Sequence, residues 1–272
     1  MLRYAQATDL PALAALRAQS AGGTLQEAAG WLQNVVGLDN VLLLEDANGA
    51  PLALLAAQPV EYGAHRGVWF SGSAVRKGLD QNVLPHLLSD CTRAFAASGC
   101  EFALATPKTT SMAGQLERLE FRNAFPRRML RIPVARNLLA QAEFDSMTVQ
   151  RILRSREHYQ PGSLPVTERS MREIMTQLYR RGLTVVSNRR GYGMYYVGED
   201  TLQFLELQAD NDHCSDLLLQ AAAERTGVRR AQVILAENQS LYLGAGRRCG
   251  YGMLRFLAKP FPVNDLYFCL LL

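Results

Sequence analysis

Apolar and polar positions alternate along the first half of the chain with the periods of strands and helices. Leu10, Leu13, Ala14 and Leu16 share one helical face, which predicts a helix with a single buried stripe. The predicted strands of this half cover residues 2–7, 41–45, 52–58, 68–75 and 100–105, with a last pair of strands over 121–134. The predicted helices cover residues 10–19, 25–36, 83–97 and 111–119. Hairpin strands followed by a β-α-β unit predict an α/β class (α+β mixed sheet) with helices on both faces.

The second half repeats most of this order after a predicted helical bridge over residues 138–156. The predicted elements are then a helix over 170–181, strands over 183–187, 193–197 and 202–208, a polar loop over 210–216, a helix over 217–225, a strand over 231–236, a helix over 239–248, and closing strands over 251–257 and 266–271. The matching order predicts a duplication into two domains, residues 1–136 and 137–272. The alternative is one larger α/β domain.

Composition argues against several classes of protein. Apolar residues make up 48% and charged residues 20%, the proportions of a packed globular chain. The basic residues behind the formal charge of +4 include scattered pairs at 127–128, 189–190 and 247–248. A nucleic-acid-binding face normally gathers such residues, so no nucleic-acid partner is expected. His65, His86 and His158 are isolated, and the five cysteines lack metal-ligand spacing, so no metal site is expected.

The sequence predicts a cytoplasmic protein. Residues 1–4 lack the apolar core of a signal peptide, and no apolar run approaches the roughly 18 residues of a membrane span. The cysteines are therefore expected to be reduced, and no membrane partner is expected. The apolar residues 266–272 either complete the fold or meet a partner chain at a sheet edge, which leaves an oligomer open.

Three segments of the first half resemble the GCN5-related N-acetyltransferase (GNAT) superfamily. Residues 3–13 resemble its opening strand and first helix, and residues 77–84 (Lys-Gly-Leu-Asp-Gln-Asn-Val-Leu) resemble its loop into a helix. Residues 117–122 resemble its Tyr-Glu-Lys-Leu-Gly-Phe-Arg segment without the Tyr, and residues 247–251 fit that segment in the second half. The resemblance implies two tandem acyl-CoA N-acyltransferase-like domains.

The resemblance also implies acetyl-CoA as the cofactor. In the family, splayed strands hold the pantetheine arm, and backbone amides at a helix start bind the pyrophosphate, a site that suits an anion. The cofactor-binding candidates are Arg76, Lys77, Gly78, Gln81 and Asn82 in the first half and Ser215 in the second.

Both candidate loops depart from the family pattern. The loop after Val75 is short, and Asp80 stands where a glycine belongs. A carboxylate there repels a pyrophosphate by about 1 kcal/mol or more, which Arg76 and Lys77 are expected to offset. The second loop, residues 211–216, contains no glycine. There Ser215 is expected to cap the helix, either facing a phosphate or as a plain N-cap.

Acyl transfer to an amine needs a base and a proton donor. Glu206, flanked by apolar residues on a predicted strand, is the candidate base, and the alternative is a solvent-facing strand residue. The family tyrosine is replaced by Leu116 in the first half and Gly246 in the second, which makes Tyr242 the candidate substitute. The alternative for Tyr242 is an aromatic side chain packed under the sheet. By analogy with some tandem acetyltransferases, the terminal carboxylate is a further candidate base.

These features predict an acetyl-CoA-dependent N-acetyltransferase-like protein that transfers an acyl group to an amine of unknown identity. Its partners would then be a small-molecule amine and an acyl-CoA. The alternative is a non-catalytic, GNAT-derived binding or scaffolding module, because both loops and both tyrosine positions are degenerate. Fold resemblance alone does not decide between enzyme and module.

Overall fold

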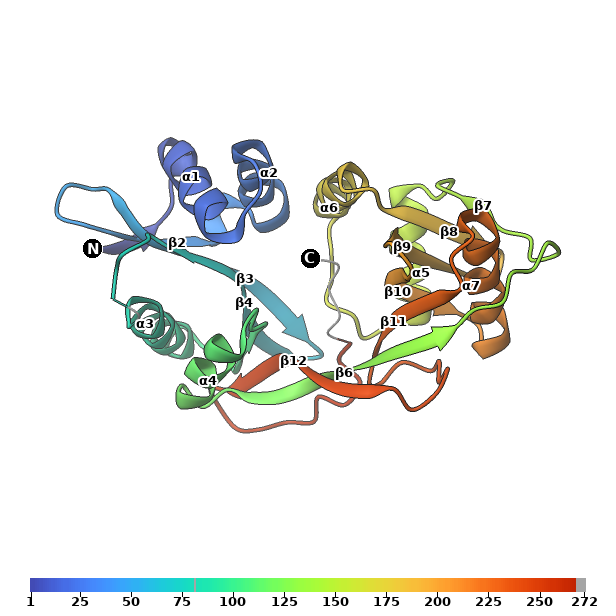
Figure 1. The fold of residues 1–272 in the computed structure, drawn as a ribbon. Coiled ribbons are helices and arrows are strands. Elements are labelled where there is room, and N and C mark those ends of the chain that lie inside the picture. Colours follow the sequence, from blue (N-terminus) through green and yellow to red (C-terminus); the bar gives the residue numbers. More distant parts are fainter. Residues whose placement is uncertain (81, 268–272) are drawn as a thin grey trace. The chain divides into compact units, whose positions relative to one another are not determined.

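The computed structural model describes residues 1–80 and 82–267, which form two compact units. Unit 1 consists of Met1–Ala124 and Tyr251–Val263, and unit 2 consists of Phe125–Gly250 and the described residues from Asn264 onward. Each unit has a mixed sheet covered by helices, which confirms the predicted fold class (Figure 1). Within the described residues, no helix combines the length and apolar character needed to cross a membrane.

Unit 1 follows the predicted alternation of strands and helices. Its strands are β1 (Leu2–Tyr4), β2 (Val41–Glu45), β3 (Pro51–Tyr62), β4 (His65–Val75) and β5 (Phe102–Ala105), joined by the second part of β12 (Arg247–Phe256). Its helices are α1 (Leu10–Ala21), α2 (Leu25–Gly30), α3 (Val83–Ala97) and α4 (Thr110–Arg118), with short turns η1 (Ala7–Asp9), η2 (Trp31–Val36) and η3 (Leu38–Asn40). The strand order is β1-β2-β3-β4-β5-β12; β4 and β5 run parallel, and the other neighbours run antiparallel.

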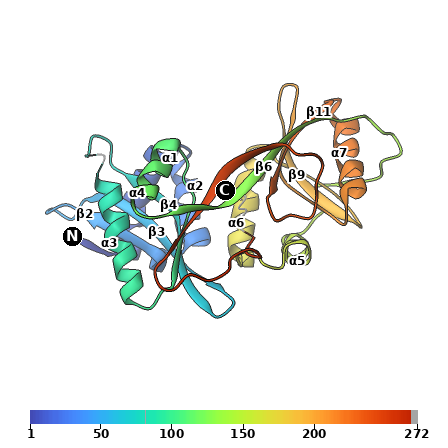
Figure 2. The same cartoon turned by 90° about the horizontal axis from the view of Figure 1, so that it is seen from below.

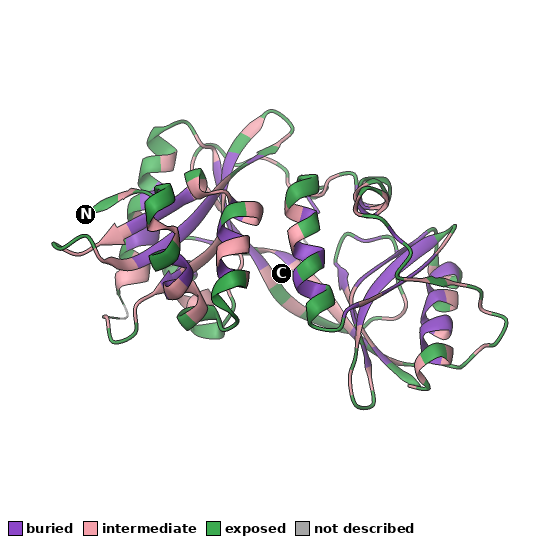
Figure 3. Ribbon diagram, turned by 90° about the horizontal axis from the view of Figure 1, so that it is seen from above, coloured by how far each residue is buried: buried purple, intermediate pink, exposed green. Residues whose placement is uncertain are grey.

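Helices cover both faces of the unit 1 sheet (Figure 1). On one face, Leu13 of α1 and Trp31 of η2 share a core with Leu54 of β3. On the other face, Leu88 of α3 shares a core with Phe70 of β4. Figure 3 shows the result as buried residues along the strands and exposed residues on the outer sides of the helices. The period-2 alternation of the strands thus divides the apolar side chains between two cores.

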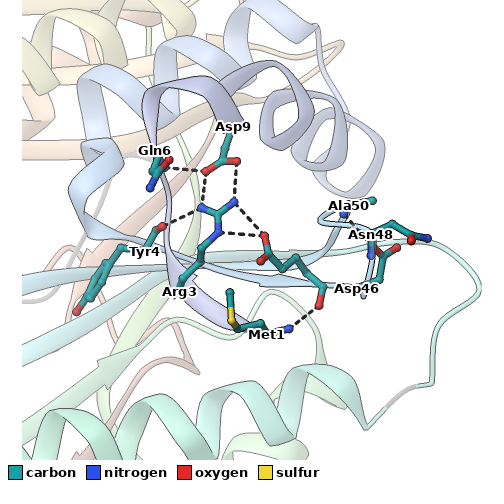
Figure 4. Close-up of polar contacts among 9 residues, drawn as sticks. Met1, Arg3, Tyr4, Gln6, Asp9, Asp46, Asn48 and Ala50 are labelled. Atoms are coloured by element: carbon teal, nitrogen blue, oxygen red, sulfur yellow. Dashed lines mark hydrogen bonds and ion pairs between the residues drawn. The ribbon is translucent and has the colours of Figure 1, made fainter.

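A polar cluster joins the N-terminal strand of unit 1 to the start of α1 and the end of β2 (Figure 4). The Arg3 guanidinium donates from Nη1 and Nη2 to the two carboxylate oxygens of Asp9, at 2.7 and 2.9 Å. Its Nε donates to Oε2 of Glu45 at 3.0 Å. The backbone amide of Gln6 also donates to Asp9, at 2.7 Å. One arginine therefore joins β1, the turn η1 before α1 and the end of β2.

Unit 2 repeats most of the element order of unit 1. Its strands are β7 (Glu143–Phe144), β8 (Thr184–Asn188), β9 (Gly191–Val197), β10 (Leu202–Ala209) and β11 (Arg230–Ala236), joined by β6 (Arg122–Pro133) from Phe125 onward. Its helices are α5 (Val149–Tyr159), α6 (Glu168–Arg180) and α7 (Asp212–Thr226). The strand order is β6-β11-β10-β9-β8-β7, with β10 and β11 parallel. Figure 2 shows α7 on one face of this sheet and α5 and α6 on the other.

The last strand of each half of the sequence belongs to the sheet of the other unit. β6 ends the first half but pairs antiparallel with β11 in unit 2. β12 ends the second half, and its residues Met253–Phe256 pair antiparallel with β5 in unit 1. The limits of the two units therefore differ from the predicted domain limits, 1–136 and 137–272. The predicted division describes how the sequence was duplicated, and it stays a prediction.

Two elements between the halves differ from prediction. The helical bridge predicted over 138–156 is confirmed only from Val149, where α5 begins, and is wrong for the residues before it. Thr148 fixes this start as a helix cap, since its hydroxyl oxygen accepts a hydrogen bond from the Arg151 amide. The predicted pair of strands over 121–134 is the single strand β6.

Three further differences lie in unit 2. The polar loop predicted over 210–216 is limited to residues 210 and 211, because α7 already begins at Asp212. The helix over 239–248 is wrong, because Gly244 and Gly246 have φ values of +116° and +63°, which an α-helix excludes. Of the closing strand over 266–271, only Leu266 and Tyr267 lie within the described residues.

Candidate functional site

The parallel strands of unit 1 part after four paired residues. β4 pairs with β5 over Gly67–Phe70 and Phe102–Ala105, while β4 continues to Val75 along β3. A β-bulge marks the parting point, because Phe70 and Gly72 face consecutive residues of β3 and Ser71 is extra. We call the region between β4 residues 71–75 and Thr106, which follows β5, the unit 1 fork.

The parallel strands of unit 2 part at the equivalent place. β10 pairs with β11 over Leu202–Phe204 and Ala231–Val233, and both strands then continue along their outer neighbours β9 and β6. A β-bulge again follows directly, here at Leu205. We call the region between β10 residues 205–209 and β11 residues 234–236 the unit 2 fork. Both sheets thus open where the family resemblance places the cofactor arm.

Two buried hydroxyl groups flank the unit 1 fork. Ser71 and Thr106 directly follow the last paired residues, Phe70 and Ala105. Their Oγ and Oγ1 atoms are buried and have no hydrogen-bond partner among the described residues. Buried polar atoms are nearly always hydrogen-bonded in folded proteins, so two exceptions at one place are informative. They fit a ligand that brings its own donors and acceptors into the fork.

Arg76, a predicted cofactor-binding residue, serves the neighbouring hairpin. Its Nη2 donates to the carbonyl oxygen of Pro51 at 2.6 Å, and its Nη1 lies 3.5 Å from Oδ2 of Asp46. Its backbone amide donates to the carbonyl oxygen of Leu52 at 2.8 Å. These contacts hold the side chain against the turn between β2 and β3.

The other predicted cofactor-binding residues of unit 1 lie between β4 and α3. Lys77 and Gly78 are exposed, and Gly78 has a φ of +84°, a conformation that favours glycine. Asn82 stands at the helix start without a side-chain cap, and its amide donates to Oδ1 of Asp80 at 2.9 Å. Gln81 lies outside the described residues. The segment thus presents one exposed positive charge, Lys77, beside the positive end of the α3 dipole, together with the exposed carboxylate of Asp80.

A side chain of unit 2 fills the unit 2 fork. The carboxamide of Gln239 joins the two strands, because its Nε2 donates to the carbonyl oxygen of Leu207 on β10 at 2.5 Å and its Oε1 accepts from the amide of Ala236 on β11 at 3.3 Å. The Nε2 atom also donates to Oε1 of Gln208 at 3.1 Å, and Gln208 donates to the Tyr267 hydroxyl at 3.2 Å. Two backbone groups inside this fork, the Leu207 carbonyl and the Ala236 amide, therefore already have a side-chain partner.

Glu206, the predicted base, lies in a buried ion pair of unit 2. Its side chain is only 2% exposed, so the alternative of a solvent-facing residue is wrong. Its Oε2 lies 3.5 Å from Nη1 of Arg156 on α5, and its Oε1 accepts a short hydrogen bond from the Tyr192 hydroxyl. Burial and then the Glu206 carboxylate raise the pKa of Tyr192 well above its ordinary value. The catalytic role of Glu206 stays a prediction.

Ser215 does not cap α7 as predicted. Asn211 is the cap, and its Oδ1 accepts from the Cys214 amide at 3.0 Å. Ser215 lies inside the first turns, fully buried, and its Oγ donates to the carbonyl oxygen of Asp212 at 2.7 Å. Burial, followed by the charge of Asp212, raises the pKa of Asp216 in the same turns. This helix start is capped by its own residues and carries acidic groups.

Tyr242 lies on an exposed loop of unit 2. Its side chain is 60% exposed, so the predicted alternative of packing under the sheet is wrong. The Tyr242 amide donates to Oδ1 of Asp212 at 2.9 Å. Arg128 of β6 donates to the carbonyl oxygens of Leu241, Tyr242 and Gly244 at 2.6 to 2.9 Å, which shapes the loop. The proton-donor role of Tyr242 stays a prediction, and the terminal carboxylate lies outside the described residues.

Sequence reasoning missed Arg17, which lies beside the unit 1 fork. Its guanidinium carbon stands 3.3 Å from the centroid of the Trp31 ring. A β-carbon added at Gly72 would lie 3.4 Å from its Nη1. Burial lowers the pKa of Arg17 to about 10, so the group stays charged at neutral pH. Arg17 lies four positions after Leu13 of the buried stripe, and this helical spacing could have identified it from the sequence.

The predicted residues thus fall into separate groups. Lys77, Gly78 and Asn82 lie at the start of α3 in unit 1, whereas Tyr242 and Ser215 lie around the start of α7 in unit 2. Glu206 belongs to the buried pair on the opposite face of the unit 2 sheet, with α5. Among the described residues, no group of three or more His, Cys, Asp or Glu side chains is arranged to hold a metal ion.

Solved structures with very different sequences share this fold. A conserved protein from Enterococcus faecalis, a probable N-acyltransferase, is 9% identical over 95% of this chain and 72% of its own, with a TM-score of 0.69. A GCN5-related N-acetyltransferase from Kribbella flavida is 16% identical over 94% and 70%, with a TM-score of 0.65. A tandem GNAT protein from the clavulanic acid biosynthesis pathway is 11% identical over 93% and 94%, with a TM-score of 0.53.

Neither a protein-family model nor a curated protein matches the sequence. At identities of 9% to 16%, the structural likeness establishes the fold and leaves the activity to be argued from the site. The two parted sheets and these alignments over nearly the whole chain show that the protein has the fold of the GCN5-related N-acetyltransferases, in a tandem form.

Proposed function

We propose that unit 1 binds an acyl-CoA in its fork and that the protein transfers the acyl group to an amine. The observation that carries this proposal is the pair of buried hydroxyls, Ser71 and Thr106, without partners at the point where the parallel strands part. An acyl-CoA supplies an activated thioester when bound. The shared fold with N-acetyltransferases supports the assignment of the fork to this ligand.

The residues around the unit 1 fork suit the parts of such a ligand. Beyond Phe70, the edge of β4 carries backbone groups that β5 does not pair, and these match the amide groups of an extended arm. Exposed Lys77 offers a positive charge to the pyrophosphate beside the N-terminus of α3. Because Gln239 fills the unit 2 fork, we expect one acyl-CoA per chain.

A second candidate is an acyl-CoA-binding module without catalysis. Leu116 of α4 stands where the resembling family often has its tyrosine acid, and it is fully buried and apolar. The described residues directly at the unit 1 fork offer hydroxyl groups and no carboxylate. Binding and turnover therefore need separate measurements.

Isothermal titration of the purified protein with acetyl-CoA tests the binding part. We expect one site per chain, and Lys77→Glu should weaken binding about tenfold by reversing a charge near the pyrophosphate. Lys259→Glu is the matched control, because Lys259 is also exposed and follows β12 at the other end of β5. It should leave the affinity within about twofold. Absence of binding by acetyl-CoA, propionyl-CoA and free CoA would disprove the proposal.

Product analysis by mass spectrometry tests the transfer part. The protein is incubated with acetyl-CoA and a mixture of primary amines, and the release of free CoA is compared with the formation of acetylated products. Acetylated amine at the expense of acetyl-CoA supports the enzyme. Tight binding without any product favours the non-catalytic module.

A further inference from the structure

Arg17 and Arg156 hold the same place in the two units. Arg17 lies seven positions after the first residue of α1, and Arg156 lies seven positions after the first residue of α5. Gly72 and Glu206 are each the first residue after the β-bulge of the forked strand. Arg17 approaches Gly72, and Arg156 pairs with Glu206. The repeated fold thus places one arginine against the same strand position twice.

The two arginines differ in whether a carboxylate of the protein pairs with them. In unit 2, Glu206 supplies it at 3.5 Å from Arg156. In unit 1 the equivalent residue, Gly72, has no side chain, and Arg17 forms no ion pair with any described residue. A guanidinium that is partly removed from water, as in Arg17, gains from a hydrogen-bonded anion beside it. Unit 1 therefore lacks the anion that unit 2 carries in its own sequence.

Trp31 orients the Arg17 guanidinium. The stacking distance of 3.3 Å engages the flat face of the group with the indole ring. The N–H donors of a guanidinium point outward in its plane, so stacking on the ring does not use them. One of them lies beside Gly72, at the unit 1 fork. The geometry suits two parallel hydrogen bonds to a carboxylate.

A buried acceptor without a partner lies on the same sheet face. Gln58 of β3 donates from Nε2 to the carbonyl oxygen of Val35, in η2 on the Trp31 side. Its Oε1 is buried and has no hydrogen-bond partner among the described residues. Gln58 is two residues along β3 from Ala56, which pairs with Gly72. A hydrogen-bond donor on a ligand, such as an amine, would give this oxygen its missing partner.

We propose that Arg17 binds a carboxylate of the acceptor, so that the acceptor is a small amine that also carries a carboxylate, an amino acid in the simplest case. The ligand carboxylate meets the Arg17 guanidinium at the unit 1 fork, beside the Trp31 ring that fills the space of a side chain at position 72, and Gln58 accepts a hydrogen bond from the ligand's nitrogen. This substrate class rests on the proposed acyl transfer at the unit 1 fork. Arg17 acts in recognition and takes no proton in the reaction.

Matched acceptors test this assignment. The protein is supplied with acetyl-CoA and either the common amino acids or the corresponding amino-acid amides, and products are identified by mass spectrometry. We expect at least one amino acid to be acetylated with a kcat/KM about tenfold or more above that of its amide. Arg17→Met, which keeps the apolar stem, should raise KM for that amino acid about tenfold or more and leave the amide within about twofold. Arg17→Lys should restore part of the preference.

Two binding measurements distinguish a failure of the proposed function from a failure of the role assigned to Arg17. Acetyl-CoA should bind Arg17→Met within about twofold of the unmodified protein, which also shows that the variant folds. Without acetyl-CoA, the preferred amino acid should raise the melting temperature of the unmodified protein and not of Arg17→Met. If the unmodified protein binds no acetyl-CoA, the proposed function fails. If it does, then equal use of amides, no acetylated amino acid, or weaker acetyl-CoA binding by Arg17→Met overturns the role of Arg17.

Discussion

The two forks are built alike but are completed by different means. In unit 2, Gln239 bridges the parted strands and Glu206 meets the buried arginine. In unit 1, the fork keeps two buried hydroxyls without partners, and Arg17 has a glycine opposite it. Because a folded chain normally satisfies its buried polar groups, the two hydroxyls without partners at the open fork support the proposal that unit 1 is the copy that binds a ligand.

The closed fork of unit 2 is linked to a missing helix. In unit 1, β5 leads into α4, whose start is capped by Thr109. The segment after β11 forms no such helix, and Arg128 instead holds it as a loop. This loop is what brings Gln239 between β10 and β11. The absence of this helix and the closure of the fork therefore go together in unit 2.

The largest expected effect tests the carboxylate of unit 2. Glu206→Leu should lower the free energy of unfolding by about 3–5 kcal/mol, because it takes the buried anion away from Arg156 and the acceptor away from the Tyr192 hydroxyl. Arg17→Met in unit 1 removes no ion pair and should cost about 1 kcal/mol from lost packing. Denaturant unfolding followed by circular dichroism measures both.

Two variants control this comparison. Glu206→Leu combined with Arg156→Met should recover most of the stability, because the buried charge is removed together with its partner. Glu206→Gln keeps an oxygen for Tyr192 and should leave acetyl transfer per folded molecule unchanged. Loss of turnover in a stable Glu206→Gln protein would instead support Glu206 as the catalytic base. It would contradict a purely structural role for the ion pair of Glu206 with Arg156.

The next effect tests the plug in the unit 2 fork. Gln239→Ala should lower the free energy of unfolding by about 2–3 kcal/mol, because the buried carbonyl of Leu207 and the amide of Ala236 lose their side-chain partner. Gln203→Ala on the exposed side of β10 should stay within about 0.5 kcal/mol. Acetyl-CoA stoichiometry should remain one in Gln239→Ala, since the acidic start of α7 disfavours a pyrophosphate. A second bound acetyl-CoA would show that the plug alone separates the forks.

Most helices and strands followed from periodicity and caps. Residues 41–45 and 83–97 were predicted with the limits that the structure has. The errors lie where local patterns compete with tertiary contacts. Residues 239–248 have helical apolar spacing, yet three hydrogen bonds from Arg128, distant in sequence, and two glycines of positive φ hold them as a loop.

The site was predictable only in part. Family resemblance led to the segment between β4 and α3, but single-residue roles depended on contacts that the sequence does not display. Arg76 turns to the hairpin, and Glu206 has an arginine 50 positions earlier as its partner. The strand exchange of β6 and β12 was also hidden, because antiparallel pairing to either β5 or β11 requires the same alternation of side chains.

The smallest expected effect tests whether the polar groups of unit 1 outside its fork are as well paired as those of unit 2. Hydrogen bonds from Arg3, opposed by burial and aided by the Gln6 amide, hold the pKa of Asp9 below its ordinary value of 3.8. Asp9 therefore adds stability above that value, and the contribution is lost as pH falls through the lower folded pKa. Asp210 of unit 2, whose pKa Arg190 and then Tyr159 lower in the same way, is the more exposed counterpart.

Asp9→Asn should thus destabilise the protein at pH 6 and become nearly neutral well below pH 3.8. Fluorescence is the suitable probe, because both tryptophans, Trp31 and Trp69, belong to unit 1. Solvent screening makes this effect smaller than that of Gln239→Ala, and Asp210→Asn should be weaker still. An equal loss of stability at pH 6 and well below pH 3.8 would show that Asp9 acts through packing and not through its charge. Unit 1 would then carry a poorly satisfied charge outside its fork.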